Sequence, residues 1–555
     1  MTRFFNTAGP VVLADHYGLP PLERWNLEEL LSLIDQKKYF VLHAPRQTGK
    51  TSCLLALMEY LNRQGKFKCL YLNVEMAQSA RENVEDGIRS IMGELAQRAE
   101  YHIQDTFCTQ NWDHILEQSG GHSALNRLIT EWCKQSEKPI VLLMDEIDAL
   151  VGDTLISVLR QIRAGYDKRP SHFPQCIVLC GVRDVRDYRI HSDKEKSIIT
   201  GGSAFNIKSE SLRLGDFTQE EMCRLYQQHT DETGQVFLPE TLKLAWEYTH
   251  GQPWIVNALG YETCFRLPEG KNRDCAITPE LLAQAKENLI QRRETHLDQL
   301  ADKLREDRVR RVIEPVLAGF GEPERLPVDD VYYVRDLGLI RTEGQIRIAN
   351  AIYREIIPRE LNYSTQVTIA HEPSWYIRDD GLLDMKKLLT AFQEFFQEHS
   401  EHWIERFDYK EAGPQLLLQA FLQRIVNGGG RIEREYGLGR MRTDLLVIWP
   451  KGRRSEAEDR KAEAGEQTSD GSRHPSSVLC PPKNQRMVIE LKILYKSLEK
   501  TIAAGLEQTW EYMDRSRADE GHLVIFDRRP NKSWKKKLFV IEKEYQGQKI
   551  IVWGM

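Results

Sequence analysis

Two short stretches of the sequence combine residue types that can act on phosphate groups. The first is HAPRQTGKTS, which follows an apolar run and precedes a segment long enough for a helix. The second is the apolar run MVIELKIL, in which Glu490 and Lys492 lie two residues apart. In the first stretch, lysine and successive backbone N–H groups can hold a phosphate, and a hydroxyl can ligate Mg²⁺. In the second, a carboxylate can bind a metal ion and the lysine beside it can activate a water. The sequence therefore predicts two separate sites for phosphate chemistry.

The first stretch matches the phosphate-binding pattern GxxxxGK[ST] except at its first position, which is Ala44. We expect its N–H groups to surround the β-phosphate of ATP, Lys50 to reach the β- and γ-phosphates, and Thr51 to ligate Mg²⁺. An alanine is compatible with this loop if its φ is negative, and a chance GKT in a strand–helix turn is the alternative. The residues expected to bind the nucleotide are Ala44, Pro45, Arg46, Gln47, Thr48, Gly49, Lys50, Thr51 and Ser52.

A second apolar run, IVLLMDEIDAL, brings two adjacent carboxylates to the end of a predicted strand. Ligands collect at the carboxyl ends of parallel strands in α/β domains. We therefore expect Asp145 to hold a Mg²⁺-bound water and Glu146 to polarise the water that attacks ATP. The alternative for this pair is the N-cap of a helix.

The elements that must position these residues follow from the spacing of the apolar runs. Four runs alternate with amphipathic segments in residues 1–215, which predicts an α/β domain around a mostly parallel, buried sheet. These runs are residues 38–44, 68–75, 139–146 and 175–182. Residues 216–303 contain helical patterns and predict a helical lid. Two helical patterns and the hairpin signal LIRTEGQIRIAN predict a winged helix at 304–362, followed by a linker at 363–385.

A second α/β domain is predicted for residues 386–555. It begins with the amphipathic helix PQLLLQAFLQRIV and continues with strands at 443–449, 487–494, 522–527, 537–542 and 548–553. Residues 451–477 contain no Ile, Leu, Val, Met or aromatic side chain. Such a segment buries too little surface to offset its ordering entropy, so residues 451–483 are expected to be a disordered loop within a hairpin.

The composition is that of a globular protein with more than one domain. Of the 555 residues, 41% are hydrophobic and 28% are charged, and the chain is too long for a single core. The formal net charge of -6 argues against nonspecific coating of nucleic acid, although it is compatible with a local basic groove. The ten cysteines include no CxxC pair, which favours free thiols in a reducing cytoplasm over a zinc site. Since no apolar run reaches the ~20 residues that span a bilayer, we expect a cytoplasmic protein without a membrane partner.

Four segments of the N-terminal region resemble the AAA-like ATPases of bacterial genomes, which are related to the STAND and origin-recognition ATPases. They are FFNTAGPV, APRQTGKTS, LLMDEID and HGQPWIVNALG, and the resemblance covers residues 1–362. It implies ATP and Mg²⁺ as cofactors and the possibility of a homo-oligomer through the ATPase domain. In these families a GxP turn of the lid senses the nucleotide. Gly251 and Pro253 match this turn, whereas Trp254 replaces the usual arginine. Residues 5–11 match the segment that lies against the adenine in relatives.

The same resemblance suggests roles for three arginines. Arg183 follows the fourth apolar run, where related ATPases keep a sensor of the γ-phosphate. A surface cluster of charges is the alternative at this position. Arg160 and Arg163 follow the carboxylate pair and are candidate arginine fingers for a neighbouring subunit.

The second helix of the predicted winged helix is acidic. Asp329, Asp330 and Asp336 lie in it with Arg335 as its single basic residue. In a DNA-binding winged helix this element enters the major groove, where an acidic helix is repelled by the phosphates. The sequence therefore favours contact with another part of the chain or with a partner.

The residues around MVIELKIL could form a metal site for phosphodiester hydrolysis. Because side chains alternate along a strand, Glu490 and Lys492 share one face, and Asp444 on the preceding strand can join them. Asp444, Glu490 and the carbonyl of Leu491 would bind Mg²⁺, while Lys492 would position or activate a water. Ordinary alternating charge on a strand is the alternative.

This constellation, followed by a helix with Gln508 and Tyr512 on one face, resembles the exonuclease-like branch of the PD-(D/E)xK nuclease superfamily. The resemblance implies a Mg²⁺-dependent nuclease and a further acidic residue from the first helix of the domain. Glu411 is the best match for that residue, and Glu433 and Glu435 are its rivals.

These patterns together predict an ATPase whose nucleotide state gates a Mg²⁺-dependent nuclease acting on DNA, in defence against phage or mobile DNA. The alternative is an ATP-driven, STAND-like signalling or assembly switch whose nuclease-like domain only binds. A third possibility is a DNA loader similar to replication initiators. The sequence leaves open whether the nucleic acid is DNA or RNA.

Overall fold

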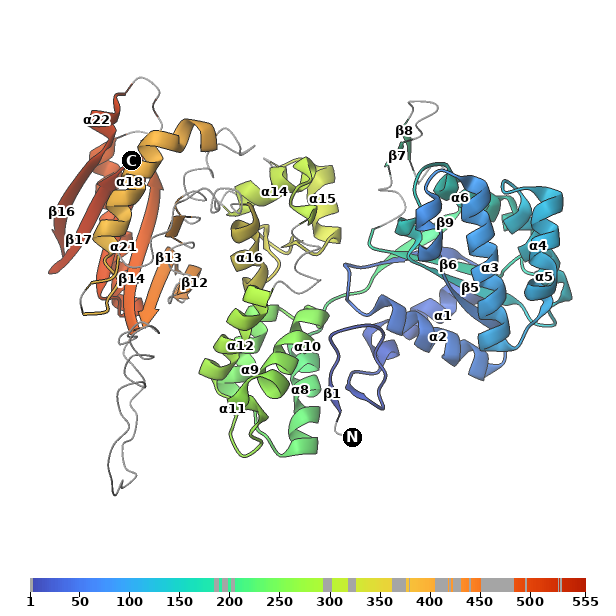
Figure 1. Ribbon diagram of the computed structural model, residues 1–555. Coiled ribbons are helices and arrows are strands. Elements are labelled where there is room, and N and C mark those ends of the chain that lie inside the picture. Colours follow the sequence, from blue (N-terminus) through green and yellow to red (C-terminus); the bar gives the residue numbers. More distant parts are fainter. Residues whose placement is uncertain are drawn as a thin grey trace, which may run out of the picture. The chain divides into compact units, whose positions relative to one another are not determined.

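The computed structural model divides the chain into two compact units, Met1–Leu300 with Pro327–Ile352, and Ala301–Leu326 with Tyr353–Met555 (Figure 1). The structure describes residues 3–183, 189–191, 198–200, 205–292, 302–317, 326–361, 376–378, 380–404, 418, 421–422, 431–438, 441–450, 484–494, 497–527, 529 and 532–555. The predicted loop at 451–483 lies outside these residues. Within the described ranges, no helix has both the length and the apolar character needed to cross a membrane.

A five-stranded sheet forms the centre of the first unit. Its strand order is β4-β5-β6-β3-β9, and every neighbouring pair is parallel. The strands are β3 (Tyr39–His43), β4 (Lys68–Asn73), β5 (Ile140–Asp145), β6 (Cys176–Gly181) and β9 (Lys208–Arg213). The four predicted strands are confirmed. The fifth, β9, has the polar sequence KSESLR at the sheet edge, which carries no apolar pattern to reveal it.

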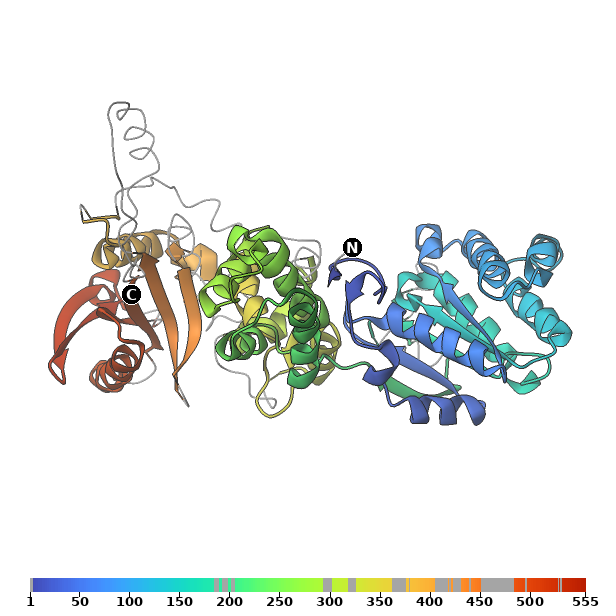
Figure 2. The same cartoon turned by 90° about the horizontal axis from the view of Figure 1, so that it is seen from below.

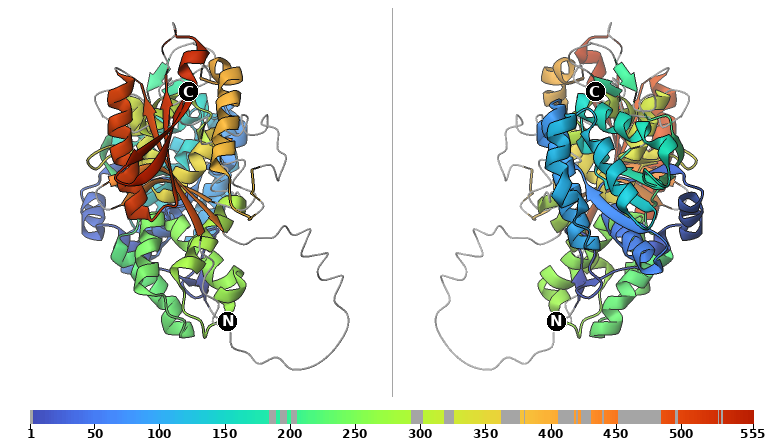
Figure 3. Two further views of the ribbon diagram at one scale, coloured as in Figure 1. Left: turned by 90° about the vertical axis from the view of Figure 1, so that its left-hand side faces the viewer. Right: turned by 90° about the vertical axis from the view of Figure 1, so that its right-hand side faces the viewer.

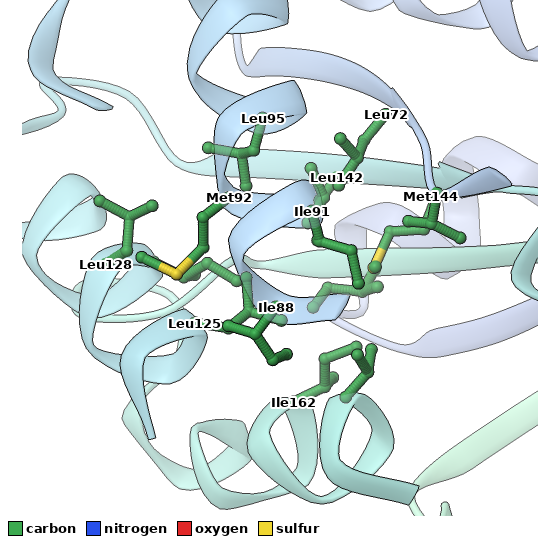
Figure 4. Close-up of a cluster of buried hydrophobic side chains, with 14 of the residues drawn as sticks. Leu72, Ile88, Ile91, Met92, Leu95, Leu125, Leu128, Leu142, Met144 and Ile162 are labelled. Atoms are coloured by element: carbon green, nitrogen blue, oxygen red, sulfur yellow. The ribbon is translucent and has the colours of Figure 1, made fainter. Parts of the chain in front are cut away.

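Helices cover both faces of this sheet, because successive strand residues point to opposite sides (Figures 1 and 2). On one face α3 (Val84–Ile103), α5 (Ala124–Gln135) and α6 (Gly152–Ala164) pack on the strands. Figure 4 shows this core, in which side chains of α3 meet Leu72 and Leu142 of the sheet. On the other face α1 (Leu27–Asp35) and α2 (Lys50–Gln64) pack on the alternate strand residues, among them Tyr71 and Leu143.

Beyond the sheet and its covering helices, the first unit is mainly helical from Gln219 to Arg292. The helices of this segment are α8 (Gln219–Thr233), α9 (Pro239–Thr249), α10 (Pro253–Tyr261), α11 (Pro268–Lys271) and α12 (Pro279–Arg292). Helix α15 (Val328–Asp336) and the hairpin of β10 (Ile340–Arg341) and β11 (Arg347–Ile348) also belong to this unit. The predicted order of helix, helix and hairpin at 304–362 is present, since α14 (Asp307–Leu317) precedes α15, and α16 (Ala351–Leu361) follows.

The second unit contains a six-stranded sheet with the order β12-β13-β14-β15-β17-β16. Strands β12, β13 and β14 are antiparallel neighbours, β14, β15 and β17 are parallel neighbours, and β16 is antiparallel to β17. The bounds are β12 (Arg431–Leu438), β13 (Met441–Pro450), β14 (Asn484–Ile493), β15 (Glu520–Phe526), β16 (Phe539–Tyr545) and β17 (Gln548–Gly554). Five of these were predicted, and β12 was missed.

Two helices sandwich this sheet (Figure 3, left). Helix α18 (Met385–Ile404) packs on one face against Leu445 and Ile489, and α21 (Leu498–Ser516) packs on the other against Leu446 and Val488. Helix α18 was not predicted, and Tyr376 in the expected linker is buried in the same core. Of the predicted helix PQLLLQAFLQRIV, only residues 418, 421 and 422 are described, and all three are helical and buried.

Candidate functional site

The phosphate-binding loop connects β3 to α2 at the carboxyl end of the sheet. Gln47 and Gly49 adopt positive φ angles of 57° and 93°, which turn the loop back on itself. Ala44 is not among the residues of positive φ, so the condition for an alanine at the first position is met. It is fully buried, and its N–H donates to the carbonyl oxygen of Gly181 at 3.2 Å. The loop therefore keeps its shape without the usual first glycine.

Lys50 begins α2 and is directed back into the loop. Its side chain is almost fully buried, and Nζ donates to the carbonyl oxygens of Ala44 and Pro45, both at 3.0 Å. The unpaired N–H groups of the first helical turn face the same loop and carry the positive end of the helix dipole. This arrangement is suited to an anion.

The two predicted carboxylates lie at the end of β5, close to the start of α2. Asp145 is fully buried, and its Oδ2 accepts hydrogen bonds from Thr51 Oγ1 at 2.7 Å and from the Tyr71 hydroxyl at 3.1 Å. Its Oδ1 accepts from the N–H of Glu146 at 3.0 Å. Burial raises the pKa of the Glu146 carboxyl, an effect that Lys50 opposes. The sheet thus brings Thr51, Asp145 and Glu146 to one place.

Two adjoining pockets open on either side of the loop. The leader-side pocket is lined by the N-terminal segment, the loop and the lid, including Asn6, Thr7, Tyr17, Thr48, Pro253 and Trp254. The phosphate-side pocket is lined by Arg46, Lys50, Thr51, Tyr71, Arg98 and Glu146. Gly9, Gln47, Gly49 and Ser52 line both. A ligand that extends along the loop could therefore contact both pockets.

The N-terminal segment is tied to the loop and to the lid by hydrogen bonds. Val11 N–H donates to Ser52 Oγ at 3.0 Å, and Trp254 Nε1 donates to the carbonyl oxygen of Thr7 at 2.9 Å. Trp254 follows Pro253, the first residue of α10, and so occupies the position of the expected arginine. Instead of supplying a charge, it fixes the segment that forms one wall of the leader-side pocket.

The glycine of the GxP turn is required by its surroundings. Gly251 has φ +80°, and a Cβ there would lie 1.9 Å from the carbonyl oxygen of Phe217. The Phe217 N–H in turn donates to the Gly251 carbonyl at 2.8 Å. This turn therefore joins the lid to the segment that leaves β9.

The three arginines with suggested roles have other surroundings in the described contacts. The Arg183 guanidinium lies over the Tyr333 ring, 5.1 Å from its centroid, and it is not among the residues that line either pocket. Arg160 and Arg163 are exposed on α6. None of them contacts Asp145 or Glu146 in the contacts described, so their roles stay predictions.

Sequence reasoning missed Tyr71, Asn73 and Arg98, which line the phosphate-side pocket. Asn73 of β4 pairs with Asp145 of β5. Tyr71 precedes Asn73 by two residues, so its side chain lies on the same face of the sheet as those of Asn73 and Asp145. A signal was present, because β4 is a predicted parallel strand whose end must lie near the end of β5. The position of Arg98, on a helix after β4, had no such signal.

The second predicted site lies on β14 in the second unit. Glu490 is almost fully buried, and Lys492 Nζ lies 2.6 Å from its Oε1. Leu491 lies between them and packs in the core on the α18 face of the sheet. Because side chains alternate along a strand, Glu490 and Lys492 lie on the opposite face, which α21 covers. Tyr512 of α21 is buried in the core of this second face, and Gln508 is half-buried.

Other members of the predicted metal site are less fully described. Asp444 lies in β13, one residue before Leu445, which pairs with Ile489. Glu411 lies outside the described residues, and its rivals Glu433 and Glu435 lie in β12. Among the side chains that the structure describes, no group of three or more His, Cys, Asp or Glu could hold a metal ion.

Comparison with known proteins found a family model that covers the P-loop and both carboxylates. Residues 34–188 match the family model AAA_22, described as an AAA domain. This part of the chain is an AAA-type P-loop ATPase domain. The matched residues contain the loop, both carboxylates and four of the five strands of the parallel sheet. A comparison with curated proteins found no match.

Several solved structures are similar to the chain. A Walker-type ATPase of Pyrococcus abyssi has 13% identity and a TM-score of 0.45, over 64% of this chain and 99% of its own. The ORC2 protein of Aeropyrum pernix has 16% identity and a TM-score of 0.36, over 61% and 91%. Cdc6p from Pyrobaculum aerophilum has 13% identity and a TM-score of 0.35, over 62% and 95%.

Proposed function

We propose that the chain binds and hydrolyses ATP with Mg²⁺ at the P-loop, and that the bound nucleotide gates a Mg²⁺-dependent DNA nuclease in residues 386–555. The observation that carries the ATPase part is the 2.7 Å hydrogen bond from Thr51 Oγ1 to the buried Asp145 carboxylate. A hydroxyl and a carboxylate held together beside Lys50 are the donor set that Mg²⁺ and a phosphate chain require.

In this proposal each residue of the loop has a separate task. Mg²⁺ neutralises charge on the phosphates, Thr51 would ligate it, and Asp145 would hold one of its waters. Lys50 would exchange the carbonyls of Ala44 and Pro45 for phosphate oxygens, which accept a stronger, charge-assisted hydrogen bond. Glu146 would orient the attacking water. Burial raises its pKa, which makes it a better proton acceptor than an exposed glutamate whenever it is ionised.

The nuclease part is supported by the connectivity of the second unit. Three antiparallel strands, β12 to β14, are followed by α21 and then by β15, which is parallel to β14. This order supports a PD-(D/E)xK-type domain, with Asp444 on the second strand and Glu490 and Lys492 on the third. The Asp444 and Glu490 carboxylates and the Leu491 carbonyl would hold Mg²⁺, and Lys492 would orient the water. The exposed Lys535 and Lys536 would contact the phosphates of DNA.

The gating part is supported by contacts of α15 inside the first unit. Asp336 is almost fully buried, and its Oδ2 lies 3.9 Å from His43 Nδ1, at the end of β3. Gly338, just after α15, faces Pro45 of the loop so closely that a Cβ would lie 2.7 Å from Pro45 Cγ. Since the loop must adjust to phosphate, α15 is well placed to sense the nucleotide. Its acidic residues then serve contacts within the chain and not DNA recognition.

The proposal is tested with purified full-length protein, linear and circular DNA, single-stranded DNA and RNA, each with and without ATP and Mg²⁺. We expect Mg²⁺-dependent cutting of DNA whose rate changes with ATP. Asp444→Ala should abolish cutting and leave ATP hydrolysis intact. Glu507→Ala, which removes an exposed carboxylate from α21, is the matched control and should cut normally. Cutting by the Asp444→Ala protein at the wild-type rate would contradict the nuclease assignment.

One observation favours a second candidate, an ATP-driven switch whose C-terminal domain only binds. Glu490 already has a close cationic partner in Lys492, at 2.6 Å, so this pair is stable as a structural ion pair. Metal binding distinguishes the two functions. Mg²⁺ or Mn²⁺ should raise the melting temperature of the C-terminal unit if its carboxylates converge on an ion, and have no effect if they do not.

A further inference from the structure

A buried tyrosine contacts the carboxylate proposed to hold the Mg²⁺-bound water. Tyr71 lies in β4 and is 3% exposed. Its hydroxyl donates to Asp145 Oδ2 at 3.1 Å, the same oxygen that accepts from Thr51. Burial and the negative charge of Asp145 both raise the pKa of the phenol, so it stays protonated and remains a donor throughout the neutral range.

The ring of Tyr71 is held by an arginine from another element. The Arg98 guanidinium of α3 lies 5.5 Å from the centroid of the ring, within the range of a cation–π interaction. Arg98 Nε also donates to Glu94 Oε1 at 2.7 Å, which fixes the arginine on its helix. Both Tyr71 and Arg98 line the phosphate-side pocket together with Glu146.

We propose that Tyr71, held by Arg98, is a positioning residue that orients Asp145 and thereby sets the Mg²⁺ requirement of the P-loop site. A carboxylate with two donors on one oxygen and one on the other has little freedom to rotate. The lone pairs left over then point in a constant direction, which is what a metal-bound water needs. This inference rests on the proposed ATPase function.

The sheet offers a matched control for Tyr71. Tyr39 of β3 is also fully buried, and its ring also lies beneath an arginine, 4.9 Å from Arg169. Its hydroxyl donates at 2.9 Å, but to the carbonyl oxygen of Pro174 and not to a carboxylate. Tyr39→Phe and Tyr71→Phe therefore remove the same buried hydroxyl from the same sheet, and only the second touches Asp145.

The experiment titrates Mg²⁺ at a fixed ATP concentration and follows both ATP hydrolysis and Mg²⁺-dependent binding of ATP. Tyr71→Phe should raise the Mg²⁺ concentration for half-maximal activity about tenfold, because a hydrogen bond to a charged group is lost. The KM for ATP at saturating Mg²⁺ should stay the same. Arg98→Ala should raise the Mg²⁺ requirement about threefold, and Arg98→Lys, which keeps a cation over the ring, should restore most of it.

The Tyr39→Phe protein should lose thermal stability and keep the wild-type Mg²⁺ requirement. A Mg²⁺ requirement in Tyr71→Phe that is within twofold of wild type, lowered, or equal to that of Tyr39→Phe would overturn the inference. Absence of Mg²⁺-dependent ATP binding in the wild-type protein would instead overturn the proposed function. The binding measurement keeps the two failures apart even if a variant hydrolyses no ATP.

Discussion

The P-loop site and the Glu490–Lys492 site differ in how much of each is local. Nine consecutive residues form the loop, and the helix that starts within it supplies the N–H groups. The proposed second site draws one residue from β13 and three from β14, and these strands are separated by 33 residues that lie between positions 450 and 484. The residues of the loop are consecutive, so the local backbone alone can arrange them. The residues of the second site come from two strands, so they meet only if these strands pair in one particular register.

The two sites also differ in how their carboxylates are satisfied. Asp145 accepts hydrogen bonds from a threonine, a tyrosine and a backbone N–H, all of them neutral donors. Glu490 Oε1 lies 2.6 Å from the ammonium of Lys492. Neutral donors leave the charge of Asp145 available to a divalent cation, whereas an ammonium competes with one. The first site is therefore prepared for a metal ion more fully than the second.

The largest expected effect is that of Lys50→Ala, which tests whether the sites are separate. It should lower ATP hydrolysis at least ~100-fold, because the charge that contacts the transferred phosphate is lost. Any Mg²⁺-induced rise in the melting temperature of the second unit should persist. Loss of both responses would mean that the two regions form a single functional unit and not two separate sites.

Removing Lys492 tests whether its ion pair is structural or catalytic. Lys492→Ala leaves the buried Glu490 carboxylate without its closest cation and should destabilise the second unit by ~2 kcal/mol, a value reduced for the partial exposure of the lysine. Denaturant unfolding measures this cost. The Glu490→Gln, Lys492→Met double variant should regain most of the stability but no DNA cutting. If it does cut DNA, the two residues have no role in the chemistry.

The pH dependence of ATP hydrolysis should reveal Glu146. Burial raises the pKa of this carboxyl, and the residue must be ionised to accept a proton. Hydrolysis should therefore fall as the pH drops through the raised pKa, at a higher pH than an exposed glutamate would give, with a tenfold loss per pH unit below it. Glu146→Gln should lower the rate at every pH and remove this acidic limb. The sharpest contradiction would be an unchanged limb in that variant.

The smallest expected effect concerns the contact between α15 and the loop. Gly338→Ala should alter ATP affinity a few-fold and change the dependence of DNA cutting on ATP, because the new Cβ meets Pro45. Gly344→Ala is the control, since Gly344 has the same φ of +78° but nothing within 4 Å of an added Cβ. Both variants share the backbone strain, so only a difference between them reports on coupling.

Much of the first region could be predicted from the sequence. The positions of the strands β3 to β6 along the chain, the loop and the two carboxylates all followed from apolar runs and the polar residues at their ends. The edge strand β9 could not be predicted, because its polar sequence carries no apolar pattern and its place in the sheet depends on pairing with the backbone of β3. Tyr71 was visible as a strand residue, but its contact with Asp145 depends on β4 and β5 being neighbours in parallel register.

In the second region the sequence indicated the strands but not what covers them. Helix α18 contains the run AFQEFF, whose apolar spacing gives no direction until the sheet is present to bury Phe392 and Phe396. Strand β12 carries charged residues between its apolar ones and pairs at an edge, so its pattern is weak. The grouping of Asp444 with Glu490 was inferred from alternation alone and stays a prediction, because the paired residues of β13 and β14 begin at Leu445 and Ile489.

By itself the sequence determined the local chemistry of this protein: a loop that can hold phosphate, two carboxylates at a strand end, and a Glu-Leu-Lys strand. These depend on neighbours along the chain, which the backbone keeps together. Only the tertiary structure decided which distant groups surround them. Tyr71 reaches Asp145, Trp254 ties down the N-terminal segment, and Gly338, just after α15, lies close to Pro45 of the loop. Such contacts depend on the register and packing of separate elements, which no residue type specifies alone.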